Sequence, residues 1–162
     1  MRIISIDPGY ERLGIAVIDK ISGKEELLYS DCIKTPKENS HADRTLELGL
    51  VLENLIKKYS PTIFVFESLF FNSNQKTAIG VSKTLGALIY VAKKEGLEVF
   101  EFTPPQIKLA VTGNGRSSKD GVIKMIPLLI KIPEKKMLDD EYDAIACGLT
   151  LFANYNMLST NN

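Results

Sequence analysis

The sequence contains few of the residues from which many catalytic and metal sites are built. Its 162 residues include one histidine, two cysteines and no tryptophan. Cys32 and Cys147 lie too far apart to match the close cysteine pairs of zinc sites, so we expect two buried thiols. A histidine-based metal site or a Ser-His-Asp triad has little material here, and we expect His41 at the surface.

The chain also lacks a long apolar run. No stretch reaches the roughly 18 apolar residues of a membrane span, and the first residues form a strand pattern without a charged and apolar leader, which favours a cytoplasmic protein. Hydrophobic residues make up 44% and charged residues 25% of the sequence, as is typical of globular domains. We expect one domain over residues 1–154 and a polar, flexible tail over residues 155–162.

Net charge is absent as well, but the charges are unevenly distributed. The segment 104–136 holds seven cations and two acids, a balance of +5, so the remainder of the chain carries −5. A basic segment beside an acidic remainder is typical of an enzyme that handles a polyanion through metal ions. A solvated helix face has the same composition, so the charge pattern alone leaves both interpretations open.

The hydrophobic pattern predicts a mixed α/β fold: a five-stranded sheet, three antiparallel strands followed by two parallel ones, with helices on both faces. Because proline lacks an N–H and crowds the preceding turn, Pro127 should kink or split the helix that begins at Lys119. The expected elements are an antiparallel unit over 2–34, a helix over 41–59, a strand over 62–67, a helix over 75–95, a strand over 97–102, shorter helices from 103 onward and a final helix over 138–154.

Acidic residues stand where two predicted strands end and where the last helix begins. Asp7 and Glu67 each end an apolar strand, and the carboxyl ends of neighbouring parallel strands lie at one sheet edge, where ligands usually bind. Asp140 and Asp143 share a helix face directed toward that edge. Asp139 adds a fifth acid, and we choose Asp140 because its partner at the i+3 position heads the face that packs on the sheet.

Four converging carboxylates would repel one another and retain protons unless cations met them. Oxygen ligands suit Mg²⁺ or Mn²⁺, and two such ions roughly 4 Å apart activate a water and stabilise a leaving oxygen in phosphodiester cleavage. The ordinary alternatives are an Asp that forms a turn before Pro8 and acids that favour a helix dipole. Taken together, the acids predict a two-metal nuclease.

Four motifs jointly resemble the RuvC-type Holliday junction resolvases: Ile-Asp-Pro-Gly at 6–9, Glu-Ser-Leu-Phe-Phe-Asn-Ser-Asn at 67–74, Val-Thr-Gly-Asn-Gly-Arg-Ser-Ser-Lys at 111–119 and Asp-Glu-Tyr-Asp-Ala-Ile-Ala at 140–146. The resemblance extends to about residue 153. It implies a ribonuclease H-like fold, a homodimer, a branch-migration motor complex as a partner, and Mg²⁺-dependent paired nicks across a four-way DNA junction. Two Mg²⁺ ions would be bound, with Mn²⁺ as a substitute, by Asp7, Glu67, Asp140 and Asp143.

The resemblance also assigns DNA contacts. Lys108 and Lys119 match lysines near the cleaved backbone, and Lys119 would balance charge in the transition state. Phe70 matches an aromatic placed against bases, and a ring stacked on an unpaired base is worth roughly 1–3 kcal/mol. The alternative is that Phe70 or Phe71 packs under the loop, which is the interpretation that we favour for Phe71. The other predicted DNA contacts are Asn74, Arg116, Ser117 and Ser118.

The expected activity is resolution of four-way junctions in recombination and repair, leaving 5′-phosphate and 3′-hydroxyl ends. A ribosomal-RNA-processing nuclease of the same fold and a non-catalytic junction-binding module are the alternatives, and the four acids argue against the second. An actin-like ATPase would need a second phosphate loop and a much longer chain. In the long helix, Gly80 and Gly86 fit either packing against a twin helix or close packing within one chain.

Overall fold

The computed structural model describes residues 1–69 and 75–158 and contains one five-stranded sheet with the order β3-β2-β1-β4-β5. The strands β1 (Arg2–Asp7), β2 (Arg12–Ile21) and β3 (Lys24–Lys34) are antiparallel, whereas β4 (Ile63–Glu67) pairs parallel with β1 and with β5 (Glu98–Phe102). The predicted arrangement of three antiparallel strands followed by two parallel strands is confirmed.

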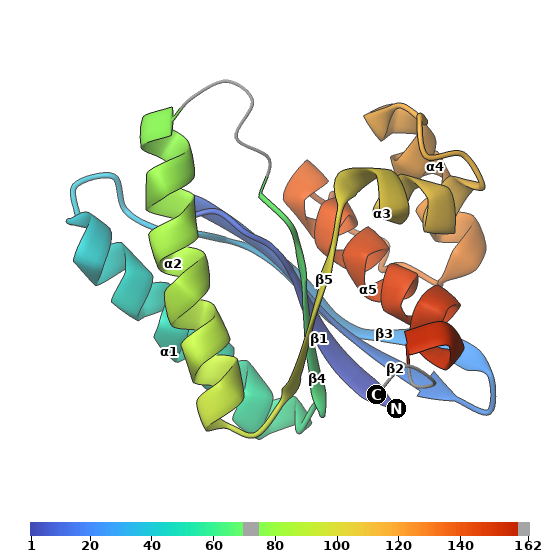
Figure 1. Cartoon of the computed structure of the whole chain (residues 1–162), viewed down its shortest axis with the longest axis horizontal. Coiled ribbons are helices and arrows are strands. Elements are labelled where there is room, and N and C mark those ends of the chain that lie inside the picture. The colour runs from blue at the N-terminus through green and yellow to red at the C-terminus, as the bar shows by residue number, and fades with distance from the viewer. Residues whose placement is uncertain (70–74, 159–162) are drawn as a thin grey trace.

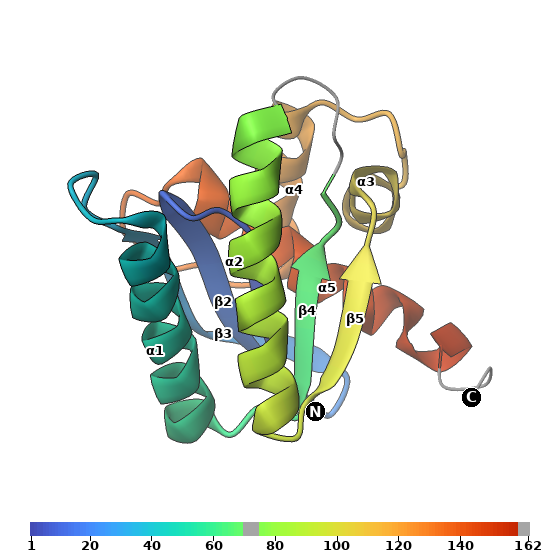
Figure 2. The ribbon, with the colours of Figure 1, turned by 60° about the vertical axis from the view of Figure 1, so that its left-hand side comes forward.

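Helices cover both faces of this sheet, as expected. Figure 1 shows α1 (His41–Tyr59) and α2 (Gln75–Lys94) on one side and α3 (Pro104–Thr112), α4 (Lys119–Leu129) and α5 (Asp139–Leu158) on the other. Figure 2 shows β4 and β5 running in the same direction, with α3 directly after the end of β5.

The alternation of side chains along β1 divides the core into two halves. Ile3 belongs to the core under α5, and Ile4 and Ile6 belong to the core under α1 and α2. Ser5 faces α5, where its buried hydroxyl donates a hydrogen bond to the Ala144 carbonyl at 2.7 Å. Because neighbouring residues of a strand face opposite sides, β1 is held by apolar packing on both faces, which fixes the position of the residue at its end.

Local sequence signals explain most element boundaries. Ser40 caps α1 by accepting a hydrogen bond from the Asp43 backbone N–H, and Ser118 caps α4 in the same way through Gly121. Pro127 was expected to kink or split α4, and the predicted split is wrong. The helix continues past Pro127 and ends two residues later at Leu129, where few intrahelical hydrogen bonds remain to be lost.

Cys32 and Cys147 are buried free thiols, as predicted. His41 is half-buried rather than exposed at the surface, because its Nε2 lies 2.9 Å from the Gly80 carbonyl oxygen and its ring packs against Tyr10.

Helix α5 extends beyond the predicted end at 154 to Leu158, and residues 159–162 of the predicted tail lie outside the described residues. No helix in the described ranges is long and apolar enough to cross a membrane.

Candidate active site

The carboxyl ends of β1 and β4 lie next to each other. Parallel pairing places Ile6 opposite Phe66, so the residues that follow them, Asp7 and Glu67, stand at the same edge of the sheet. Both side chains belong to half-buried residues. The two strands therefore bring together acids that are 60 positions apart in the sequence.

A close helix–sheet contact brings the start of α5 to this edge. Gly14 of β2 pairs with Asp7 of β1, and a Cβ atom on Gly14 would collide with the carbonyl oxygen of Asp140. Farther along the helix, a Cβ on Gly148 would lie 2.7 Å from the hydroxyl of Ser5. Glycine at these two positions allows the helix to approach the sheet closely, and the helix acids consequently lie beside the strand acids.

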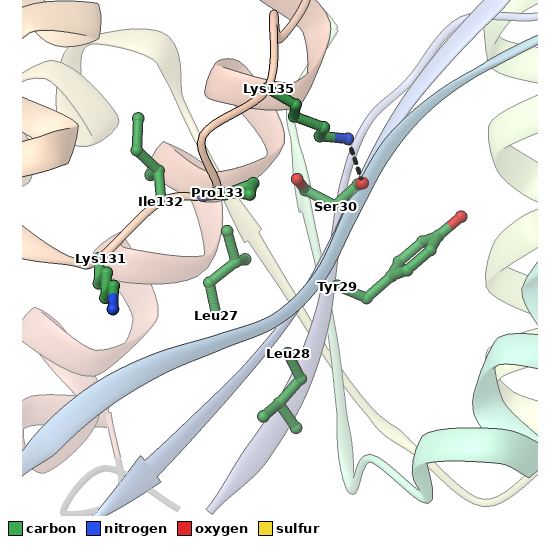
Figure 3. A pocket seen from close by; sticks show the side chains of 8 residues that line it. All are labelled: Leu27, Leu28, Tyr29, Ser30, Lys131, Ile132, Pro133 and Lys135. Atoms are coloured by element: carbon green, nitrogen blue, oxygen red, sulfur yellow. Dashed lines mark hydrogen bonds between the residues drawn. The ribbon is translucent and has the colours of Figure 1, made fainter.

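Glu141 anchors the first turn of α5. Only 3% of the residue is exposed, and its carboxylate accepts hydrogen bonds from the Ser30 hydroxyl at 3.0 Å and the Leu138 N–H at 3.1 Å. Lys135 pairs with the same carboxylate at 2.8 Å and also donates to the Ser30 carbonyl at 3.0 Å, a contact drawn in Figure 3. Figure 3 shows a cavity of about 390 Å³ beside this anchor, which is lined by residues of β3 and of the connector after α4 and by neither strand acid. A buried, fully bonded Glu141 fixes the position of its neighbour Asp140.

Cations from two other elements hold the helix acids. Arg12, at the start of β2, forms an ion pair with Asp140, and Lys119, at the start of α4, pairs with Asp143 at 2.7 Å. The Asp139 side chain is 63% exposed and lies 3.6 Å from the Lys119 ammonium, whereas the Asp140 side chain is 19% exposed. Asp140 is thus the more enclosed of the two candidates for the third acid.

The strand acids are electrostatically strained. Burial, followed by the negative charges of Asp143, Glu67 and Asp140, raises the pKa of Asp7 from 3.8 to about 8. Burial and the charge of Asp143 raise the pKa of Glu67 to about 7, against the opposing effect of Lys119 and Lys108. Burial also raises the pKa of Asp143, although its hydrogen bond with Lys119 acts in the other direction. Shifts of this kind arise where like charges share a partly buried site.

Among the described residues, two cavities open at the acids, and each combines a strand acid, a helix acid and at least one cation. One of about 290 Å³ is lined by Asp7, Asp140 and Arg12 among others. The other, of about 260 Å³, is lined by Glu67, Asp143, Lys119 and Lys108 among others. Both are large enough to admit water and a small ionic group.

The donor set fits hard divalent cations, because the acids are oxygen ligands whose mutual repulsion a cation would relieve. The hydroxyl of Ser68, the residue after Glu67, is buried without a hydrogen-bond partner in the described ranges. As arranged here, no three acidic, histidine or cysteine side chains among the described residues form a group that could hold a metal ion. Arg12 and Lys119 engage the two helix acids in this arrangement, so metal binding requires those carboxylates to exchange partners.

The predicted DNA contacts lie in different surroundings, and only some of them line the cavities at the acids. Lys108 lines the cavity beside Glu67, and Arg116 is exposed. The Ser117 hydroxyl lies 2.7 Å from that of Thr112, and the Ser118 hydroxyl is the helix cap of α4. Phe70 and Asn74 lie outside the described residues.

The sequence motifs do not identify Arg12 as a residue of the site. The sequence does contain a signal for its position. The turn after Asp7 returns the chain along β1, so a residue at the start of the second strand must lie beside the end of the first. With Asp7 opposite Gly14, Arg12 extends just past the acid.

The comparisons with known proteins agree with this geometry. A family model described as crossover junction endodeoxyribonuclease RuvC matches residues 3–151. The chain belongs to the RuvC family. A RuvC protein of Thermosipho melanesiensis is 39% identical over 151 residues, covering 93% of this chain and 96% of the relative, and that of Moorella thermoacetica is 36% identical over 149 residues, covering 92% and 89%.

A solved RuvC structure supports the fold assignment. The structure of Thermus thermophilus RuvC in complex with a Holliday junction substrate matches with a TM-score of 0.90 and 27% identity, covering 98% of this chain and 97% of that one. The predicted ribonuclease H-like α/β fold is thereby confirmed, and so is the RuvC resemblance seen in the motifs.

Proposed function

We propose that this RuvC-family protein is an endodeoxyribonuclease that resolves four-way DNA junctions by paired nicks, in recombination and repair. The observation that carries the proposal is the gathering of Asp7, Glu67, Asp140 and Asp143 at one sheet edge, where burial and mutual repulsion raise the pKa of the strand acids. A site that disfavours its own negative charges is suited to divalent cations, and RuvC relatives are named for junction cleavage.

The four acids would hold two Mg²⁺ ions, with Mn²⁺ as a substitute. When bound, such ions supply electrostatic stabilisation of the attacking and leaving oxygens of a phosphodiester. The fold positions the elements that carry these acids. Strands β1 and β4 are packed on both faces, and the hydrogen bonds of Glu141 hold the start of α5 against the sheet. The strands and the helix that carry the ligands are therefore in place before substrate arrives, and only the pairing of the helix acids with Arg12 and Lys119 has to change, which lowers the cost of reaching the transition state.

Lys119 is the proposed catalytic cation. Its ammonium pairs with Asp143 at 2.7 Å and lines the cavity that also contains Glu67 and Lys108. A phosphate in that cavity would gain negative charge on its oxygens during cleavage, and an ammonium at this position stabilises that charge. Departure of the 3′ oxygen leaves 5′-phosphate and 3′-hydroxyl ends. Lys108, Arg116, Ser117 and Ser118, with Phe70 and Asn74 outside the described residues, are the proposed DNA contacts.

The protein would act as a homodimer, because paired nicks in a two-fold symmetric junction require two active sites. The proposed contact is the groove between α1 and α2, a cavity of about 470 Å³ rimmed by exposed apolar side chains that include Leu46, Leu50 and Tyr90. Gly80 is explained within the chain, since a Cβ there would lie 2.8 Å from the Tyr10 ring. Gly86 borders open space and is free to meet a partner helix. A branch-migration motor complex remains a predicted partner.

A gel assay with a synthetic four-way junction tests the proposal. The protein should nick opposite strands of the junction in Mg²⁺ or Mn²⁺, leave a duplex of the same sequence intact, and give ends that ligase can rejoin. Equal cleavage of a structured ribosomal RNA fragment would favour the RNA-processing alternative. Junction binding without nicking under any divalent cation would favour the non-catalytic module.

A further inference from the structure

Arg12 has the same relation to Asp140 that Lys119 has to Asp143. Each cation opens a secondary-structure element, β2 or α4, and each forms an ion pair with one acid of α5. Each also lines the cavity that its acid lines. The motifs assign Lys119 a place beside the cleaved backbone, and they leave Arg12 without a role.

We infer that Arg12 is a tethered cation that competes with the divalent cation for Asp140 and moves to a DNA phosphate when DNA binds. The inference rests on the proposed function, because it takes Asp140 to be a metal-binding residue. It adds that substrate and metal help each other to bind, since DNA removes the competitor from a metal ligand.

Competition follows from the position of the guanidinium. A carboxylate paired with arginine is less available to a metal ion, and the positive charge of Arg12 repels a second cation in the same cavity. The Arg12 side chain is 48% exposed, so it can leave Asp140 without disturbing packed neighbours. Its backbone remains in place, because the adjoining turn is tied to Thr35 through the Tyr10 carbonyl at 2.6 Å and the Glu11 carbonyl at 3.2 Å.

Transfer to DNA follows from chemistry and location. Guanidinium is planar and always charged, and it donates paired hydrogen bonds to phosphate as readily as to carboxylate. Arg12 stands at the same sheet edge as Asp7, so a phosphodiester bound at the acids lies within its reach. Once Arg12 has moved to a phosphate, the carboxylate of Asp140 is free.

The first test measures Mn²⁺ binding by calorimetry without DNA. Arg12→Gln should bind Mn²⁺ about tenfold more tightly than wild type, since removal of a unit charge within a few ångströms of a cation site near the surface is worth about that factor. Arg12→Lys, which keeps the charge, should stay within about threefold of wild type.

Arg2→Gln is the matched control. Arg2 pairs with Asp19 at 2.7 Å at the opposite end of β1, so the change removes the same charge from the same kind of ion pair. Arg2 and Asp7 are five steps apart along the strand, about 16 Å, which exceeds the Debye length at physiological salt. Its Mn²⁺ affinity should lie within about twofold of wild type.

The second test repeats the titration with Ca²⁺ in the presence of a short DNA duplex. DNA should tighten Ca²⁺ binding to wild type by a larger factor than to Arg12→Gln, with the difference again about tenfold. Metal affinity of Arg12→Gln equal to or weaker than that of Arg2→Gln would overturn the inference and leave Arg12 as a structural ion pair. Tightening by Arg12→Lys as large as by Arg12→Gln would also overturn it. Failure of wild type to bind Mn²⁺ would instead refute the proposed function, and this inference with it.

Discussion

Replacing Asp7 by asparagine should stabilise the metal-free protein. With a pKa of about 8 in the folded protein against 3.8 unfolded, this carboxyl group holds a proton at neutral pH that the unfolded chain releases. Holding that proton at pH 7 costs at most about 4 kcal/mol, from about 1.4 kcal/mol for each pH unit above 3.8, and relaxation of the neighbouring acids reduces the cost. Asparagine is neutral and of the same size, so Asp7→Asn removes this cost.

The sign of the pH dependence is fixed by the direction of the shift. An acid whose pKa is raised on folding favours the folded state most at low pH, and this advantage is lost as pH rises toward the folded pKa of about 8. The benefit of Asp7→Asn should therefore fall from at most about 4 kcal/mol at pH 7 to at most about 2 kcal/mol at pH 5.

Urea denaturation in EDTA at both pH values measures this difference. Glu98→Gln, at an exposed residue of β5, is the control and should change stability by less than about 0.5 kcal/mol. Addition of 10 mM Mg²⁺ should raise the stability of wild type and have little effect on Asp7→Asn. An Asp7→Asn protein less stable than wild type at pH 7, or a gain that does not shrink toward pH 5, would refute the electrostatic reasoning.

The start of α5 and the α1–α2 groove can each be tested by substitution. Gly14→Ala should displace Asp140, destabilise the protein by about 1–3 kcal/mol and slow junction nicking at least a hundredfold. Gly86→Ala, whose Cβ meets open space, should instead stabilise its helix by up to about 1 kcal/mol. Urea denaturation measures both stabilities, and a nicking assay measures the rate. Leu50→Glu should convert a dimer into monomers in sedimentation velocity, and Leu128→Glu, at a more exposed leucine on α4, should leave the dimer intact. Equal effects of the two changes would exclude the proposed interface.

Much of this fold follows from local signals in the sequence. A continuous apolar run bounded by Ser60-Pro61 and a lone acid specifies β4, and Ser40 and Ser118 mark helix starts that the structure reproduces. The placement of Asp7 beside Glu67 followed from the rule that parallel strands end at one edge. These features depend on a residue and its near neighbours.

The missed features depend on contacts between distant segments. Nothing in the local sequence separates Glu141 from the other acids at the start of α5, yet it is buried against Ser30, which is 111 positions away, and paired with Lys135. The local sequence places Arg12 near the sheet edge, but its partner Asp140 lies 128 positions away. A local pattern cannot identify which acid pairs with which cation, because the ion pairs form only when α5 packs on the sheet.

Nicking by a Glu67 variant in Mg²⁺ shows whether the acids at the sheet edge bind the ions that cut DNA. Wild type should nick a synthetic four-way junction in Mg²⁺ and be inactive in EDTA, while Glu67→Gln should lose at least a thousandfold in rate and still bind the junction within about threefold of wild-type affinity in Ca²⁺. Nicking by Glu67→Gln at the wild-type rate, or by wild type in EDTA, would show that the gathered carboxylates do not bind the ions that cut DNA.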